Sequence, residues 1–474
     1  MNRYPWIVSL ALLASLSACE VETTTVAPAA NAPKVILIIG DGMDDQQVTI
    51  GRNYLVGSRG RLVLDGMPYR GAAEVQTVAA YNAAQVVYVG DSASGGTAMA
   101  SGTVTAVHRI GVAADGEAEH VNIMELAQAA GMRTGIVTTA RVTDATPAAF
   151  YGHISDRYCQ MPGDMVKEDK VTPQDSTDCT TDYKANGGPG SLAEQLADSA
   201  VDIVLGGGAR DFTEFVEGSD SVSVLQSAHD NGFAVISRGE ELAALKSDGK
   251  VLGLFSPGDM PERWQGSGGR IAHFIERREG EVIWPEPFAC EPKPEDATTP
   301  MLADMTRAAL AHLDGGAGFM LMIESASIDK AAHHWRPCGH IGEMKQLDDT
   351  LQVVLDYAAA HPETLVLVTA DHGQSAQLIP QVSGFAPQNF APEGRFARIL
   401  TPEGGIMGIS YATNDSPLWE EHSGVEVPVY ASGPRTGDLP EFLRQIDVFN
   451  IAATYLGLRD AWPDTKQAGG TEKE

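Results

Sequence analysis

Positive charge is scarce in this chain of 474 residues, in which 33 Lys and Arg residues face 63 Asp and Glu residues. The formal net charge of −30 argues against nucleic acids and anionic lipid surfaces as partners, because a negative surface repels both. Two common catalytic loops are also missing. Gly206-Gly207-Gly208 lacks the following Lys-Ser/Thr of a phosphate-binding P-loop, and no G-x-S-x-G motif supports an α/β-hydrolase triad. An anionic substrate would therefore need a locally positive site, for which bound divalent cations are the obvious source.

Long apolar runs are few. Trp6–Leu16 follows Arg3 and is too short to span a bilayer comfortably, which is typical of a signal peptide over residues 1–18. The run ends in Leu16-Ser17-Ala18-Cys19, which is similar to the lipobox of bacterial lipoproteins, in which Cys19 becomes the lipidated first residue. An ordinary cleavable signal with an incidental Cys19 is the alternative. No later stretch is long and apolar enough to cross a membrane.

The two ends of the chain differ in composition from its body. Residues 19–33 are rich in Thr, Val, Ala and Pro, which predicts a flexible tether behind the lipidated cysteine. Residues 463–474 form a polar tail. We therefore expect a folded domain over residues 34–462, exported to the periplasm and attached to a bacterial membrane only through Cys19.

Cysteine is also sparse, with five residues in all. Setting Cys19 aside leaves Cys159, Cys179, Cys290 and Cys338, and an even number in an exported protein predicts two disulfides. Three pairings are compatible with four cysteines. None of the four has the spacing of metal ligands.

Short apolar runs alternate with amphipathic segments through the body of the chain. Runs that predict strands buried on both faces lie at residues 35–39, 135–139, 201–205, 319–323 and 365–369. Helical periodicity marks residues 122–130, 191–200, 301–313 and 341–360. The alternation predicts an α/β fold with a large, mainly parallel central sheet and helices on both faces. Residues 257–300 and 374–421 break the rhythm and are predicted to be insertions over the active-site end of the sheet.

Side chains that can bind metals follow several of these predicted strands. They are Asp41, Thr146, Glu324, the pair Asp329 and His333, and the pair Asp371 and His372. Ligands of open parallel sheets bind at the carboxyl ends of the strands, so this coincidence predicts a metal site there. Taken singly, each residue has a structural alternative, namely a turn, a helix cap or a surface Asp–His contact.

Ser92 is the candidate nucleophile. It lies in Asp91-Ser92-Ala93-Ser94-Gly95-Gly96-Thr97-Ala98, and a helix starting here would direct its amide groups at an anion. A serine-rich loop with a capping serine is the alternative.

Six motifs resemble, in their order along the chain, those of bacterial alkaline phosphatases. They are Gly40-Asp41-Gly42-Met43, Asp91-Ser92-Ala93, Asp144-Ala145-Thr146-Pro147-Ala148-Ala149, Glu324-Ser325-Ala326-Ser327-Ile328-Asp329-Lys330, Thr369-Ala370-Asp371-His372 and Glu421-His422-Ser423-Gly424. The similarity extends from about Lys34 to Gly457. It implies the disulfides Cys159–Cys179 and Cys290–Cys338. The segment Ser94-Gly95-Gly96 departs from an alanine-rich stretch that is usual in the family.

The resemblance also implies two zinc ions and one magnesium ion. The first zinc would be held by Asp329, His333 and His422, with His333 preferred to His334 because of its spacing from Asp329. The second zinc would be held by Asp41, Asp371 and His372, and magnesium by Asp41, Thr146 and Glu324, with Asp144 orienting some of its waters. Arg157 would grip the phosphate, oriented by Asp91, and Lys330 would reach the phosphate through water.

The activity implied is hydrolysis of small phosphate monoesters through a phosphoserine at Ser92. Dimers are frequent in the family, so a homodimer is an open alternative to a monomer. A phosphodiesterase or sulfatase of the same superfamily is the nearest rival, although diesterases usually carry threonine as nucleophile and sulfatases need a C/S-x-P-x-R context. A binding protein without turnover is the rival from another class.

Overall fold

The computed structural model describes Met1 and residues 32–167, 177–246, 248–294, 296, 298–380, 394–414 and 416–459. The predicted lipobox with Cys19, most of the tether and the polar tail lie outside these residues. Among the helices described, none combines the length and the apolarity that a membrane span requires.

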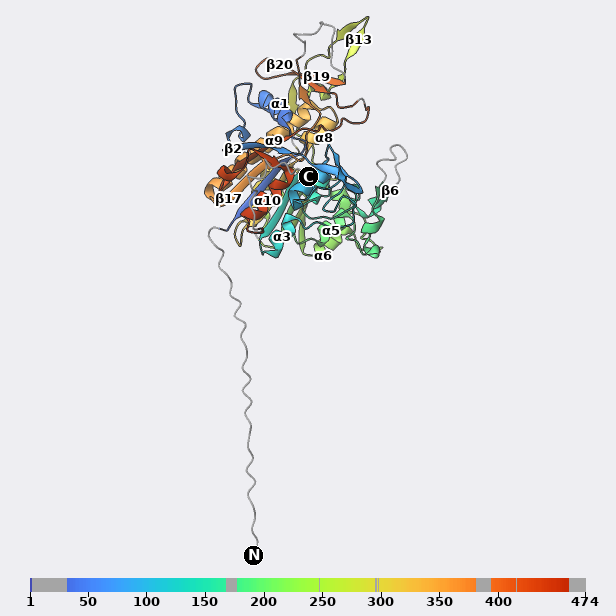
Figure 1. Ribbon diagram of the computed structural model, residues 1–474, viewed down its shortest axis with the longest axis vertical. Coiled ribbons are helices and arrows are strands. Elements are labelled where there is room, and N and C mark those ends of the chain that lie inside the picture. Colours follow the sequence, from blue (N-terminus) through green and yellow to red (C-terminus); the bar gives the residue numbers. More distant parts are fainter. Residues whose placement is uncertain are drawn as a thin grey trace, which may run out of the picture.

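A ten-stranded mixed sheet organises the molecule (Figure 1). Its strands, in spatial order, are β22 (Phe442–Arg444), β2 (Tyr69–Glu74), β21 (Val427–Ser432), β17 (Thr364–Thr369), β1 (Lys34–Gly40), β16 (Phe319–Ser325), β5 (Arg133–Arg141), β8 (Ile203–Gly207), β10 (Lys250–Leu254) and β9 (Phe233–Ile236). The pairs from β17 to β9 are all parallel, whereas β21 is antiparallel to both of its neighbours. All five predicted strands are confirmed, with ends shifted by at most a few residues.

Helices surround this sheet. They are α1 (Asp45–Leu55), α2 (Ser92–Ser101), α3 (Ile123–Ala129), α4 (Ala145–Ala148), α5 (Leu192–Asp198), α6 (Val224–Asp230), α7 (Leu302–Leu313), α8 (Ser327–His333), α9 (Pro337–Ala360) and α10 (Gln445–Tyr455). One group packs α9 against α1 and α7, and another packs α2 against α3, α4 and α10. Every residue of β1, β16 and β17 is buried, so both faces of the central sheet are covered, as predicted.

The two segments predicted as insertions build a second, smaller layer beyond α1, α8 and α9 (Figure 1). The described part of this layer contains β11 (Trp264–Gly266) paired with β15 (Cys290–Pro292), and a four-stranded sheet of β12 (His273–Phe274), β19 (Arg395–Leu400), β20 (Ile406–Tyr411) and β18 (Gln377–Leu378). β12 belongs to one insertion and its partner β19 to the other. A hydrophobic cluster of its own, which includes Trp335, Ile399 and Tyr411, joins the layer to α9.

Two disulfides, Cys159–Cys179 and Cys290–Cys338, confirm the pairing that the family resemblance implied. The second disulfide links β15 to the first turn of α9, so it ties the insertion layer to the main body.

Candidate active site

The parallel register of the central strands brings their carboxyl ends to one level. Ile39 of β1 is opposite Glu324 of β16 and Thr369 of β17. Asp41 and Asp371 each lie two residues beyond these positions, so register alone places the two carboxylates beside one another, with Glu324 on the other side of β1.

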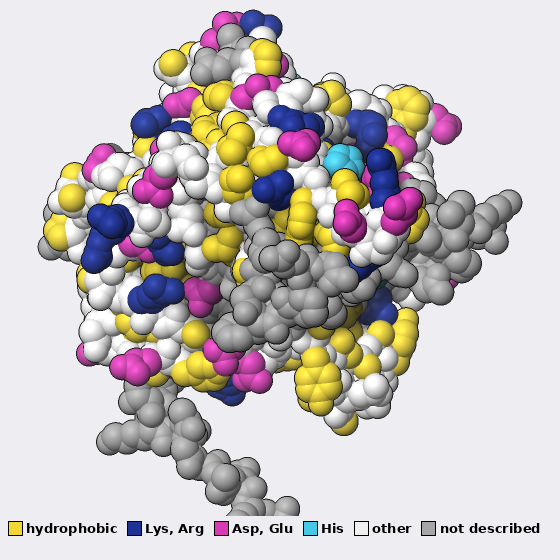
Figure 2. Space-filling view, turned by 90° about the horizontal axis from the view of Figure 1, so that it is seen from above, with side chains coloured by type: hydrophobic (Ala, Val, Ile, Leu, Met, Phe, Trp, Pro, Cys, Tyr) yellow, Lys and Arg dark blue, Asp and Glu magenta, His cyan; other side chains and the backbone are white. Residues whose placement is uncertain are grey.

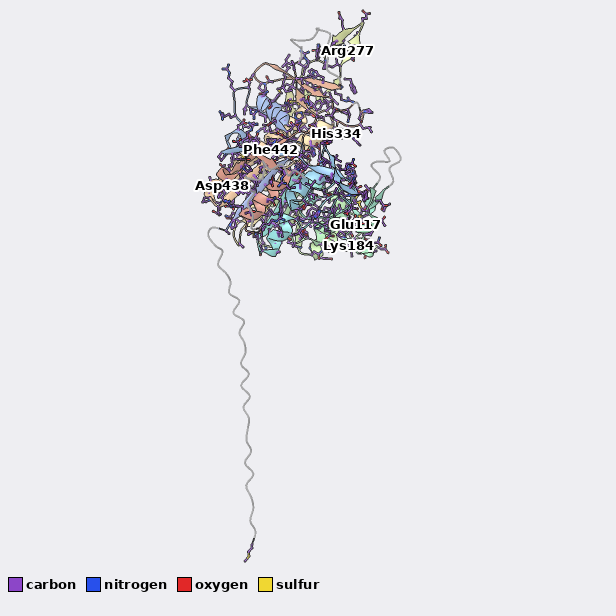
Figure 3. All side chains as sticks on the ribbon, viewed as in Figure 1. Glu117, Lys184, Arg277, His334, Asp438 and Phe442 are labelled. Atoms are coloured by element: carbon purple, nitrogen blue, oxygen red, sulfur yellow. A yellow bond between two sulfur atoms is a disulfide. The ribbon has the colours of Figure 1, made fainter. Side chains whose placement is uncertain are left out.

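Asp329, His333 and His422 form one cluster at this edge. Asp329 and His333 lie on successive turns of α8, with 3.2 Å between Asp329 Oδ2 and His333 Nε2. His422 comes from the loop before β21, and its Nε2 is 3.0 Å from His333 Nε2 and 3.5 Å from Asp329 Oδ1. His334, by contrast, is exposed; Figure 3 shows it between the insertion layer and the main sheet. The preference for His333 is therefore consistent with the fold.

Asp41, Asp371 and His372 form the second cluster, which is fully buried. His372 Nε2 is 3.4 Å from Asp41 Oδ1 and 3.5 Å from Asp371 Oδ2. Backbone amides of Gly42 and His372 donate to Asp371 Oδ1, at 3.0 and 3.1 Å, and so hold that carboxylate in place. His372 also groups with Asp329 and His422, because its ring stacks on that of His422 at 3.7 Å between centroids. The two clusters are therefore contiguous.

Each of the three histidines has its Nδ1 against a backbone carbonyl. The partners are the carbonyls of Gly373 for His372, at 3.1 Å, of Gly90 for His422, at 2.9 Å, and of Glu420 for His333. A carbonyl can only accept, so each Nδ1 carries a hydrogen and each Nε2 faces the cluster, where the neutral ring would offer a lone pair to a cation. This is the arrangement that metal-binding histidines adopt.

Ser92 is the first residue of α2, at the edge of the second cluster. Asp91 caps the helix by accepting from the Ser94 amide at 3.0 Å, so the capping residue is Asp91 and not a serine. Ser92 Oγ lies 3.3 Å from His372 Nε2. Gly95 permits this approach, because a Cβ at this position would lie 2.4 Å from the carbonyl oxygen of Asp371. The departure at Ser94-Gly95-Gly96 thus fits close packing of α2 against the strand end.

Arg157 and Lys330 bring positive charge to the other side of Ser92. The Arg157 guanidinium donates to Asp91 Oδ2 at 3.1 Å and to Asp144 Oδ1 at 3.2 Å, and Lys330 Nζ binds Asp144 Oδ2. Burial opposes ionisation of Asp91, but the charge of Arg157 outweighs it and lowers the pKa of Asp91 to about 2. The two carboxylates thus stay ionised and fix both cations.

Thr146 and Glu324, predicted for a third cation, are buried at the same edge. The Thr146 hydroxyl is 3.4 Å from Asp371 Oδ2, and the Thr138 hydroxyl donates to Glu324. Burial raises the pKa of Glu324 to about 8. Burial, reinforced by the charges of Asp371, Asp329 and Glu324, also raises the pKa of Asp41 well above its ordinary value. Burying several ionised carboxylates together without a balancing cation carries a large free-energy penalty.

These residues fit divalent cations. A tetrahedral ion with bonds of about 2.0–2.1 Å separates its ligands by about 3.3 Å, close to the donor separations in both clusters. Asp41 Oδ1 is buried and accepts no hydrogen bond from any described residue, which leaves it available to a metal. The oxygen-only set of Asp41, Thr146 and Glu324 suits a harder ion than the histidine-containing clusters do.

Several supporting residues escaped prediction. Gln374 donates to Asp329 Oδ1, and Thr138 holds Glu324. Gln374 lies two residues beyond His372, at the start of a segment predicted as an insertion, and its irregular sequence gave no signal for this contact. Asp259, whose Oδ1 accepts from the Arg141 amide at 3.0 Å and lies 3.8 Å from Lys330 Nζ, belongs to an irregular insertion and gave no signal.

The first cluster and Ser92 open into a cleft of about 850 Å³. Its lining includes Ser92, Arg157, Lys330 and His422, together with insertion residues such as Glu262 and Lys293. The cleft is therefore bounded by the sheet end on one side and by the insertion layer on the other.

Comparison with known proteins agrees with this geometry. A family model described as alkaline phosphatase matches residues 32–397. The chain is 38% identical over 473 residues to streptomycin-6-phosphate phosphatase from Streptomyces griseus, covering 97% of this chain and 99% of that protein. It is 34% identical over 438 residues to alkaline phosphatase from Escherichia coli strain K12, covering 90% and 87%. Among solved structures, alkaline phosphatase from the Antarctic bacterium TAB5 matches with a TM-score of 0.64 at 22% identity, covering 91% of this chain and 100% of that one, and shares the fold. The chain belongs to the alkaline phosphatase family.

Proposed function

We propose that this protein hydrolyses phosphate monoesters to an alcohol and inorganic phosphate through a phosphoserine intermediate on Ser92. The observation that carries the proposal is the position of Ser92 Oγ, at the N-terminus of α2 and 3.3 Å from His372 Nε2, in a cleft that the half-buried Arg157 also lines. Family membership supports monoester hydrolysis as the general activity.

Metal ions complete the proposed site. Zinc is assigned to Asp329, His333 and His422 and to Asp41, Asp371 and His372, because mixed nitrogen and oxygen donors suit zinc. Magnesium is assigned to Asp41, Thr146 and Glu324, with Asp144 orienting its waters. When bound, these ions would lower the pKa of the serine hydroxyl and offset the charge of the phosphoryl and leaving oxygens.

The side chains around Ser92 have distinct roles in the proposal. Arg157, held by Asp91 and Asp144, offers its guanidinium fork to the non-bridging oxygens of the phosphoryl group. Lys330 acts on the same group through water. Ser92 Oγ forms a bond to phosphorus as the ester P–O bond breaks, and water then breaks the Oγ–P bond and releases phosphate. Two successive in-line displacements retain configuration at phosphorus.

The substrates proposed are small phosphate monoesters. One relative is named for a single phosphate ester and others for the general activity, so the shared class is the one assigned here. Residues 34–462 form the proposed catalytic unit, exported to the periplasm and held at a membrane through Cys19. The two disulfides support export, because disulfides persist in oxidising compartments. For the oligomeric state, a homodimer and a monomer are the two alternatives.

Hydrolysis of p-nitrophenyl phosphate and of bis(p-nitrophenyl) phosphate at basic pH tests this proposal. Monoester turnover should exceed diester turnover, disappear on chelation, and return only when zinc and magnesium are both added. A preference for the diester would move the protein to the neighbouring diesterases and contradict the roles of Thr146, Glu324 and Arg157. Turnover that survives complete chelation would contradict the metal assignment.

A further inference from the structure

One wall of the cleft, formed by the insertion layer and the start of α9, carries two basic side chains, Lys293 and Arg336. Both pair with one carboxylate, Glu262. Lys293 Nζ lies 3.4 Å from Glu262 Oε2, and Arg336 Nη2 lies 3.0 Å from Glu262 Oε1. Two cations thus share a single anion, which leaves a surplus positive charge at this wall.

The exposed atoms of this cluster are the cationic ones. The side chain of Glu262 is 9% exposed, whereas those of Lys293 and Arg336 are 33% and 38% exposed. Glu262 lies against the first turn of α9, since a Cβ at Gly339 would come within 2.9 Å of its Oε2. The positive end of that helix therefore also stabilises the carboxylate. Glu262 also lines the cleft, but it is the least exposed of the three, so a ligand in the cleft meets chiefly the two basic side chains.

The fold also holds the two cations rigidly in relation to each other. Lys293 follows β15 and Arg336 precedes α9, and the disulfide Cys290–Cys338 joins these two elements. The backbone amide of Lys293 donates to the Arg263 carbonyl at 2.7 Å. Arg336 lies three residues beyond His333, and both line the cleft together with Lys293, so the two cations share the cleft with the first metal cluster. Such preorganisation lowers the entropic cost of binding a ligand between them.

The charge of the lining supports a role in recognition. Acidic residues outnumber basic ones by 63 to 33 in the whole chain. The cleft is closer to balance, because five basic residues line it together with six acidic ones. The basic residues are Arg141, Arg157, Lys293, Lys330 and Arg336, and the acidic ones are Asp91, Asp144, Asp259, Glu262, Asp329 and Glu421. Figure 2, a view from above onto the end of the molecule that carries the insertion layer, shows Lys and Arg side chains interspersed with acidic ones on this face.

We infer that Lys293 and Arg336 form a second anion-binding subsite, which favours phosphate monoesters whose alcohol carries a further carboxylate or phosphate-like group. The inference rests on the proposed function and deepens it by naming a substrate class. The phosphoryl group to be cleaved occupies the site at Ser92, and the second anion of the same molecule binds at the insertion wall. Glu421, which also lines the cleft and accepts from Trp419 Nε1 at 2.7 Å, has no basic partner among the described residues and disfavours an anion on its own side.

Three alkyl phosphates of equal chain length test the subsite. They differ only at the end far from the ester, which is a hydroxyl, a carboxylate or a non-hydrolysable phosphonate. The reacting ester stays the same in all three, so the ratio of kcat/KM values isolates the terminal charge. We expect the wild-type enzyme to prefer either anionic terminus by about 5-fold at low salt, chiefly through KM, with the preference falling in high salt. A larger effect for phosphonate than for carboxylate would identify the phosphate-like group as the better ligand.

Variants locate the effect. Lys293→Gln and Arg336→Gln should each lower the preference about 2-fold, and the double variant should bring the ratio close to one. Turnover of p-nitrophenyl phosphate should change less than about 2-fold in all of them. Lys345→Gln is the matched control, because Lys345 lies on α9, further along the chain than Arg336, and pairs with the exposed Asp349. Arg336→Lys keeps the charge and should retain most of the preference.

The outcomes separate the two proposals. If p-nitrophenyl phosphate is hydrolysed but the anionic termini bring no preference, the subsite is wrong and the proposed function stands. A preference that survives in the double variant likewise overturns the subsite. If p-nitrophenyl phosphate is not hydrolysed at all, the proposed function fails and the subsite with it.

Discussion

Every residue of β1 and β16 is buried, whereas β12 and the hairpin of β13 (Glu276–Arg278) and β14 (Glu281–Ile283) are largely exposed. The first two strands belong to the centre of the parallel sheet, and the others belong to the insertion layer. Arg277, on that hairpin, marks the tip of the layer, far from His334 at the cleft (Figure 3). The sheet positions its side chains through continuous hydrogen-bonded register. The insertion layer relies on a disulfide, short strands and a separate hydrophobic cluster.

This difference corresponds to a division of chemical roles. The sheet ends carry Asp41, Glu324 and Asp371, whose mutual positions tolerate little error because the proposed cations would be shared between them. The insertion layer carries Glu262 and Lys293, which line the cleft at the proposed second anion subsite. The division is incomplete, because Gln374 and Glu420 of the second insertion hold Asp329 and His333. The insertion layer therefore also supports the metal clusters.

Replacement of Ser92 should produce the largest effect. Ser92→Ala removes the proposed nucleophile and should lower kcat for p-nitrophenyl phosphate by about 10⁴-fold or more, equivalent to about 5.5 kcal/mol. Ser101→Ala is the matched control on the same helix, since Ser101 Oγ only donates to the Thr97 carbonyl at 2.8 Å. Near-normal turnover in Ser92→Ala would remove the serine from the mechanism, and thermal unfolding of both variants would show that the fold is intact.

Removal of the Cys290–Cys338 disulfide should destabilise the insertion layer more than the central sheet. Its sequence separation of 48 residues corresponds to a loss of about 4 kcal/mol in the free energy of unfolding when both cysteines become alanine. Hydrogen exchange should then accelerate in β11 and β15, while β1 and β16 stay protected. Equal acceleration in all four strands would mean that the insertion layer and the sheet unfold as one unit.

Gln374→Ala tests how far the insertion supports the metal clusters. Loss of the amide that donates to Asp329 should raise the zinc concentration needed for half-maximal activity by about 10- to 100-fold, with little change at saturating zinc. Zinc titration of chelator-treated enzyme measures this, with the exposed Gln377→Ala of the same insertion as control. An unchanged titration curve would mean that Gln374 does not contribute to zinc affinity, and that the sheet ends and α8 hold the ligands without it.

Sequence reasoning succeeded where structure depends on local pattern. Apolar runs located β1 and β16, and the residues behind them located Asp41 and Glu324. The disulfide pairing and the role expected of Arg157 came only from the family resemblance, because a surface arginine is common in many folds. The resemblance also decided between the two interpretations of Ser92, a nucleophile or a capping serine. Contacts such as Gln374 to Asp329 depend on long-range packing of an irregular segment, which has no periodicity to interpret.

Two buried tyrosines, one in the central sheet and one in the insertion layer, allow the most direct comparison of the two regions. The changes expected in the free energy of unfolding are the smallest of those predicted. Tyr430 of β21 is 1% exposed, and its hydroxyl has no hydrogen-bond partner among the described residues. Tyr411 of β20 is fully buried, but its hydroxyl pairs with His340 Nε2 at 3.0 Å. Tyr430→Phe should leave the free energy of unfolding at pH 8 unchanged or raise it by about 1 kcal/mol, because an unsatisfied polar group is removed. Tyr411→Phe should lower it by about 1–2 kcal/mol, because His340 loses its partner.

The pH dependence of Tyr430 sharpens this prediction. Burial raises the pKa of Tyr430 to about 12, above its ordinary value of 10.0. Below pH 10 the hydroxyl is protonated in the folded and unfolded states alike, so its titration changes nothing. Between pH 10 and pH 12 the unfolded state releases the proton first, and wild-type stability falls by up to about 1.4 kcal/mol per pH unit from this group. Urea unfolding at pH 8 and pH 11 should therefore show the advantage of Tyr430→Phe growing with pH. A constant difference would mean that the Tyr430 hydroxyl titrates in the folded protein as it does in the unfolded chain, and so reaches water despite its burial in the sheet.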